Sequence, residues 1–140
     1  MSKKHLHVLL IRTFAAHKKK SRQRFQDLGL TEGQPKVLSI LCGMEGCLQK
    51  ELAEACRVEP ATMTSLLKNM EQKGLIYKEK LQVAGKRAYA IYLTESGKVQ
   101  ANKVLKIVEE LEEVSFKGFT SEEKKQFLEL FERVKDNLAD

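Results

Sequence analysis

Small polar and cationic side chains gather on one face of a predicted helix that begins near Pro60. Apolar residues recur in this segment at helical spacing, at Met63, Leu66, Leu67 and Met70. Another face is predicted to carry Thr64, Ser65, Lys68 and Asn69 beside Ala61, and Thr62 is a further candidate contact. Their hydroxyl, amide and ammonium groups suit hydrogen bonding to the phosphates and base edges of duplex nucleic acid. The exposed face of an ordinary helix would carry the same residue types, so the neighbouring elements decide between the two interpretations.

A second short helix is predicted just before this one. Its apolar positions are Leu48, Leu52, Ala53 and Cys56. The connection is only Arg57-Val58-Glu59, and the fixed φ of Pro60 suits the first position of the next helix. Gly74 favours an end to that helix, because glycine readily adopts the left-handed conformation of a C-terminal stop. Two amphipathic helices joined by so short a turn indicate a helix-turn-helix.

A basic β-hairpin is predicted directly after the second helix. Residues 75–80 and 88–93 form two strand-like runs on either side of a tip at 84–87. Lys78, Lys80, Lys86 and Arg87 make the hairpin basic. A basic hairpin after a helix-turn-helix indicates a winged helix that binds duplex DNA. Lys86 and Arg87 are candidate DNA contacts, and we expect Arg87 to enter a minor groove, where negative potential favours arginine.

Long helices are predicted on both sides of this segment. Residues 3–28 contain neither glycine nor proline, and residues 95–118 and 121–138 carry apolar side chains at helical spacing. Gly118 separates the last two helices, and Thr120 followed by Glu123 predicts a capping box. The expected fold is therefore mainly α, with a small β-hairpin as the wing.

The segment from 49 to 97 resembles the DNA-binding core of the multiple antibiotic resistance regulator (MarR) family of bacterial winged-helix transcription factors. The matching stretches are QKELA at 49–53, EPATMT at 59–64, EQKGLI at 71–76 and LTESG at 93–97. The resemblance implies one MarR-like domain over 1–140. Its winged helix would span 31–93, and helices at 3–28 and 95–138 would intertwine two subunits.

The resemblance also implies how such a protein acts. A homodimer would place its two recognition helices in successive major grooves of a pseudo-palindromic operator, about 10 bp apart. Family members commonly repress promoters, and many are released by a small aromatic or phenolic effector bound between the dimerisation and DNA-binding parts. The expected dimer interface comprises Leu6, Leu9, Leu10, Phe127, Leu130, Phe131 and Val134.

Three positions depart from the family pattern. Gly85 stands where many members carry an aspartate that braces the wing, which implies a looser tip. Ser65 stands where an arginine is frequent, and Glu59 stands where a shorter capping residue is usual. We therefore expect a base preference that differs from that of typical members.

Charge and composition agree with a regulator and not with an enzyme. The net charge is +6, and every charged side chain before Asp27 is a lysine or arginine. The run at 17–20 is, by itself, typical of a solvated helix face. No catalytic constellation, phosphate loop, metal site or cofactor motif is expected, since His5 and His7 would point to different faces of one helix. Without an apolar run near 18 residues or a signal-peptide cleavage site, we expect a cytoplasmic protein.

Two alternatives come from other classes of function. A winged helix can serve as a protein-interaction module, with its basic surface against an acidic partner. The chain could also be a redox-responsive or metal-responsive DNA-binding regulator, because it has three cysteines. Cys42 and Cys56 are expected in the core, whereas Cys47 lies in a Gly-flanked loop, directly after Gly46, and is expected to be the exposed thiol.

Overall fold

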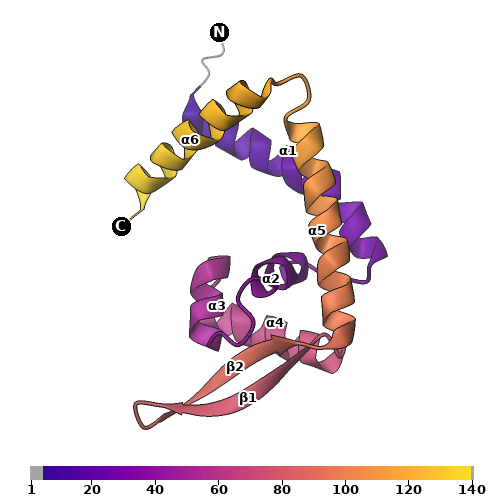
Figure 1. Ribbon diagram of the computed structural model, residues 1–140, viewed down its shortest axis with the longest axis vertical. Helices are drawn as coiled ribbons and strands as arrows, with labels where there is room; N and C mark the ends of the chain where they lie inside the picture. Colours follow the sequence, from indigo (N-terminus) through magenta and orange to yellow (C-terminus); the bar gives the residue numbers. More distant parts are fainter. Residues whose placement is uncertain (1–4, 140) are drawn as a thin grey trace. The chain divides into compact units, whose positions relative to one another are not determined.

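Six helices and two strands make up the part of the chain, residues 5–139, that the computed structural model describes (Figure 1). In order they are α1 Leu6–Asp27, α2 Gln34–Leu41, α3 Gln49–Cys56, α4 Pro60–Gln72, β1 Ile76–Val83, β2 Lys86–Leu93, α5 Glu95–Ser115 and α6 Ser121–Leu138. This order confirms the predicted winged helix-turn-helix with flanking helices. The predicted first helix starts at residue 3, which lies outside the described residues.

The chain divides into two compact units, residues 1–108 and 109–140. Helices α1 to α4, the hairpin and most of α5 belong to the first unit, while the end of α5 and all of α6 belong to the second. The hairpin of the first unit extends away from α2, α3 and α4 (Figure 1).

The core of the first unit lies between α2, α3, α4 and the base of the hairpin. Leu38, Leu52 and Leu67, from three different helices, are fully buried, and Ile91 closes the core from β2. Burying one such side chain contributes about 1.5–3 kcal/mol relative to leaving it in water. Helix α4 buries Met63, Leu67 and Met70 and half-buries Leu66, as its apolar spacing predicts.

The ends of α4 follow from local sequence. Pro60 is its first residue, and the side chain of Glu59 makes no capping hydrogen bond, in keeping with its greater length. Gly74 has a φ of +75° and ends the helix. On the other side, Arg57 takes a left-handed conformation at φ +55°, so the turn between α3 and α4 is as short as the sequence predicts.

The tip of the hairpin is tighter than expected. Ala84 and Gly85 both have positive φ, at +51° and +78°, and Val83 pairs directly with Lys86. Two central residues at positive φ match the twist of the flanking strands, so pairing continues to the tip. The predicted strands are therefore too short, because Lys86 and Arg87 belong to β2 and not to the tip. The looser wing that Gly85 implies stays a prediction.

One polar joint connects the end of α4, the base of the hairpin and the start of α5. The backbone N–H of Thr94 donates to the carbonyl of Leu75 (3.1 Å), and its hydroxyl donates to the carbonyl of Gly74. The N–H of Gly97 in turn donates to the Thr94 hydroxyl oxygen (2.9 Å). Gly97 packs so closely on Leu75 that a Cβ atom would overlap the Leu75 carbonyl oxygen.

The second unit is a helix end, a turn and α6. Gly118, at φ +85°, lies in the turn, and the predicted capping box is present. In it the N–H of Glu123 donates to the Thr120 hydroxyl, and the Glu123 carboxylate accepts from the N–H of Thr120. Phe127 stacks on Phe131 at 5.5 Å between ring centroids, yet α6 has no buried residue.

Gly97→Ala should destabilise the first unit by about 3 kcal/mol or more, because the new methyl group has to displace a backbone carbonyl. Gly43→Ala is the matched control, since a Cβ atom there meets only the Ile40 carbonyl oxygen at 3.8 Å. Thermal unfolding followed by circular dichroism would compare the two. Equal melting temperatures for the two variants would show that the contact between Gly97 and Leu75 can accommodate an added methyl group.

Candidate nucleic-acid interface

The exposed face of α4 presents polar groups that have no partner in the described part of the chain. Among residues 5–139, the Ser65 hydroxyl and the Lys68 ammonium make no hydrogen bond or ion pair, and both side chains are exposed. Thr62 is exposed one turn before Ser65. The structure therefore places these three predicted contacts on one accessible face, opposite the buried Met63, Leu67 and Met70.

The two flanks of α4 are bonded to the preceding helices. Gln49 of α3 donates to the hydroxyl oxygen of Thr64 (3.0 Å), and that hydroxyl donates to the Pro60 carbonyl (3.0 Å). On the other flank, Gln34 of α2 donates to the amide oxygen of Asn69 (2.7 Å). Thr64 and Asn69 were predicted from the sequence as DNA contacts, but the two glutamines were not. The only signal for them was a polar residue at the start of each preceding helix.

The wing carries its cations mostly on one face. Strand register pairs Gln82 with Arg87, Lys80 with Tyr89 and Lys78 with Ile91. Because directly paired residues share a face and side chains alternate along a strand, Lys78, Lys80 and Arg87 lie on the same side. Lys86, paired with Val83, lies on the opposite side. The structure thus separates the two predicted wing contacts, and it groups Arg87 with two lysines.

The root of the wing is held by aromatic and backbone contacts. Tyr77 and Tyr92 are paired across the strands and stack at 5.2 Å between ring centroids. The ammonium of Lys78 lies 5.6 Å from the centre of the Tyr89 ring, within the range of a cation–π contact. Backbone bonds between Gly46 and Ile91 and between Ile91 and Cys47 attach β2 to the loop before α3. The base of the wing is therefore fixed to the helix-turn-helix.

Two of the three cysteines do not lie where the sequence predicts. Cys42, the residue that directly follows Leu41 at the end of α2, is exposed. Cys47, expected to be exposed, is half-buried against the core, and Cys56 is buried as predicted. Burial raises the pKa of both the Cys47 and Cys56 thiols, and the carboxylate of Glu51 adds to the rise at Cys47. A raised pKa keeps these thiols protonated and unreactive near neutral pH.

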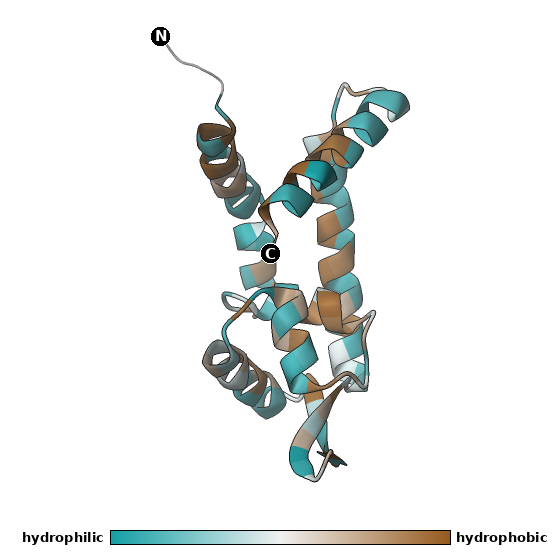
Figure 2. Ribbon diagram, turned by 90° about the vertical axis from the view of Figure 1, so that its left-hand side faces the viewer, coloured by the Kyte–Doolittle hydropathy of each residue, from teal (hydrophilic) through white to brown (hydrophobic). Residues whose placement is uncertain are grey.

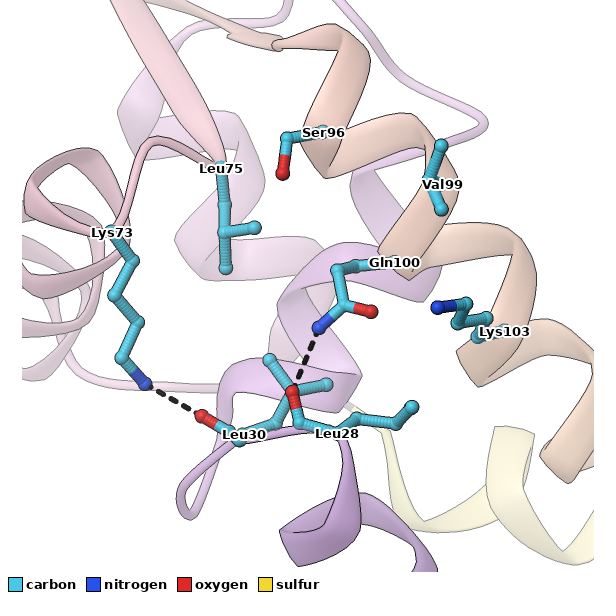
Figure 3. Close-up of a pocket in the computed structure, with 9 residues that line it drawn as sticks. Leu28, Leu30, Lys73, Leu75, Ser96, Val99, Gln100 and Lys103 are labelled. Atoms are coloured by element: carbon cyan, nitrogen blue, oxygen red, sulfur yellow. Dashed lines mark hydrogen bonds between the residues drawn. The ribbon is translucent and has the colours of Figure 1, made fainter.

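A cavity of about 360 Å³ opens beside the joint at Thr94 (Figure 3). Its apolar part is formed by leucine and valine side chains, and two lysines enter it, Lys73 from the end of α4 and Lys103 from α5. The Lys73 ammonium donates to the Gly29 carbonyl (2.9 Å), and the Gln100 amide donates to the Leu28 carbonyl (2.8 Å). Its lining residues are Leu28, Gly29, Leu30, Lys73, Leu75, Ser96, Val99, Gln100 and Lys103.

Large apolar side chains remain exposed on α1 and α6. In the first half of α1, Leu6, Leu9 and Leu10 are exposed, and Phe14 is 68% exposed. On α6, Phe127, Leu130 and Phe131 are exposed, and Val134 is half-buried. Figure 2 shows hydrophobic residues along both helices. These residues include the whole set predicted for a dimer interface, whose pairing stays a prediction.

Comparison with known proteins settles the family. Residues 30–83 match the model of the MarR family. The HTH-type transcriptional regulator YybA of Bacillus subtilis is 34% identical over 118 residues, which cover 84% of this chain and 78% of that protein. The chain belongs to the MarR family. The transcriptional regulator HosA of Escherichia coli is a more distant relative, 28% identical over 75% of this chain and 77% of its own length.

Solved MarR family structures share the fold. The Staphylococcus aureus MepR–DNA complex has a TM-score of 0.86 at 25% identity and covers 98% of this chain and all of that one. A MarR family regulator from Listeria monocytogenes, complexed with a 26mer DNA, has a TM-score of 0.83 at 26% identity. The match covers 98% of this chain and 90% of that chain. These relatives are transcriptional regulators and not enzymes. Within residues 5–139, no helix is long and apolar enough to span a membrane.

Proposed function

We propose that this MarR family member is a sequence-specific regulator that binds duplex DNA through α4 and the wing. The observation that carries the proposal is the face of α4 on which Ser65 and Lys68 are exposed and unpaired, beside a hairpin with Lys78, Lys80 and Arg87 on one side. The MepR and Listeria structures, solved with DNA, support the same use of the fold. Such a regulator would act on chromosomal DNA in the bacterial cytoplasm.

The proposed contacts divide by their place on the molecule. Ser65 and Lys68 would meet the bases of the major groove, and Thr64 would contact the groove from the flank of α4 beside α3. Thr62 and Asn69 would lie nearer the phosphates. On the wing, Arg87 would enter the minor groove, and Lys86 would meet the backbone from the other side of the hairpin. A protein-binding winged helix would need large apolar side chains on the exposed face of α4, and none is exposed there.

The regulator is proposed to act as a homodimeric repressor. The apolar faces of α1 and α6 would be covered by a second copy of the chain, because exposed patches of this kind are unfavourable in water. Two-fold symmetry would then match a pseudo-palindromic operator.

An effector is proposed for the cavity beside the joint at Thr94. Its volume, about 360 Å³, falls in the range of small-ligand sites, and its two lysines with an apolar lining suit a small aromatic anion. By linkage, a ligand that favours the form of the protein that binds DNA poorly will weaken DNA binding.

DNA binding is tested by fluorescence anisotropy with duplex from upstream of the protein's own gene, at several salt concentrations and with unrelated duplex as competitor. We expect tight binding that survives the competitor, with a steep dependence on salt from counterion release. Binding that the competitor abolishes at every salt concentration would contradict a specific site on that duplex.

The same titration tests the wing. Arg87→Ala should cost about 1 to 3 kcal/mol of binding free energy and should reduce the influence of flanking A·T pairs. Glu79→Gln, a change in an exposed β1 residue on the other face of the hairpin, is the matched control. Equal affinities for the wild type and Arg87→Ala would contradict the proposed contact of Arg87 with the minor groove.

Leu130→Glu tests the dimer, because it places a charge in the exposed apolar face of α6, where Leu130 is 56% exposed. Multi-angle light scattering should show a monomer or an aggregate in place of a dimer. Lys125→Glu, on the polar face of the same helix, should leave the dimer intact. A well-folded dimer of Leu130→Glu would show that α6 does not contribute this face to the interface.

Benzoate, which joins an apolar ring to a carboxylate, tests the effector site. In the anisotropy assay it should weaken DNA binding by the wild type, and Lys103→Ala should remove most of this effect without changing the affinity for DNA alone. Benzamide, which has the same ring but no charge, is the control ligand. An equal response of the wild type and Lys103→Ala to benzoate would exclude this cavity as the site.

A further inference from the structure

A buried polar residue, Gln34, lies beside α4, the helix that is proposed to contact DNA. Gln34 begins α2 and is only 1% exposed. Burying a side-chain amide is unfavourable unless its groups are hydrogen-bonded. Its hydrogen-bond partners come from the α1–α2 loop, from α4 and from the residue that follows α4, so Gln34 joins these segments.

The partners of Gln34 determine which way its amide points. Its oxygen accepts from the backbone N–H of Thr31 (3.0 Å) and from the Lys73 ammonium (2.9 Å). A backbone N–H and an ammonium can only donate, so the group facing them has to be the oxygen. The Gln34 nitrogen is therefore left to face Asn69. This orientation follows from the chemistry of the partners, which is how amide orientations are assigned.

Asn69 is oriented in turn by Gln34. The Gln34 nitrogen donates to the Asn69 amide oxygen at 2.7 Å, and because an amide nitrogen only donates, Asn69 has to accept. The Asn69 nitrogen, with its two N–H groups, is then directed away from this bond. Asn69 is exposed, one turn after Ser65 and on the side of α4 that adjoins α2. The helix therefore offers hydrogen-bond donors at this flank.

We infer that Gln34 and Lys73 act as positioning residues that hold Asn69 as a hydrogen-bond donor to a DNA phosphate. This inference rests on the proposed DNA-binding function. A helix in a major groove has its flanks against the sugar-phosphate walls, and the face between them lies against the bases. Phosphate oxygens only accept hydrogen bonds, so a donor at the flank binds them and a carbonyl oxygen there would be repelled. Because the Lys73 ammonium fixes the orientation of the Gln34 amide, Asn69 presents its N–H groups, and not its oxygen, to the DNA.

Gln34→Glu tests the orientation. A carboxylate still accepts from Thr31 and Lys73 but has no donor for Asn69, so Asn69 has to turn its nitrogen inward and present its oxygen to the DNA. We expect DNA affinity to fall about tenfold on the upstream duplex and on unrelated duplex alike, because a phosphate contact is independent of sequence. The melting temperature should change little, since the introduced carboxylate pairs with the Lys73 ammonium. A loss confined to particular base sequences would overturn the phosphate assignment.

A double-mutant cycle separates positioning from a general effect of charge. Asn69→Ala alone should lose about as much affinity as Gln34→Glu. In the Asn69→Ala background, Gln34→Glu should change affinity less than about twofold, because the residue through which it acts is gone. An undiminished tenfold effect in that background would overturn the inference.

Side-chain amide NMR of the wild-type protein gives a second test that does not depend on a variant. On addition of the upstream duplex, the Asn69 N–H resonances should shift, while those of Gln34 should stay protected from solvent exchange with and without DNA. Unmoved Asn69 resonances in a protein that binds the duplex would overturn the inference and leave the proposed function intact. A wild-type protein that binds no duplex would contradict the proposed function itself.

Discussion

Burial of one side of α4 is the constraint on which the rest of the interface depends. Met63, Leu67 and Met70 are fully enclosed by α2, α3 and the base of the hairpin. A shift by one residue would rotate the helix by about 100° and expose apolar surface that is worth several kcal/mol. The core therefore sets the rotation of α4, and the rotation places Ser65 and Lys68 outward. Packing on one side of α4 therefore determines which side chains are available to contact DNA on the other side.

Hydrogen bonds along the edges of α4 further fix the rotation of the helix that core packing sets. Gln49 and Gln34 bond to Thr64 and Asn69 on opposite flanks, so the helix is fixed on both sides by residues of α3 and α2. At its end, the joint at Thr94 connects it to the hairpin and to α5. Lys73 belongs both to the Gln34 network and to the lining of the cavity. A ligand there would compete for the same ammonium that orients Asn69, which gives effector binding a physical route to the DNA-binding face.

Much of this fold was predictable from sequence because its signals are local. Apolar spacing predicted α4 and its buried face, and Pro60, Gly74 and the Thr120–Glu123 pair marked helix ends. The tip of the wing was mispredicted because a two-residue turn here requires Ala84 to adopt a positive φ, which alanine seldom does. Cys42 was misplaced because the apolar residues before it suggested burial, whereas burial ends at Leu41. The Gln34–Asn69 bond spans 35 positions, and a contact between such distant side chains leaves no periodic pattern.

The two copies of α4 in the proposed dimer would together read a symmetric DNA sequence. Selection of bound duplexes from a random-sequence library, followed by sequencing, tests it most directly. The account predicts an enriched pseudo-palindrome whose half-sites are about 10 bp apart, the spacing that places two recognition helices in successive major grooves on one side of the duplex. Enrichment of a single asymmetric site, or no enrichment above the starting library, would contradict it.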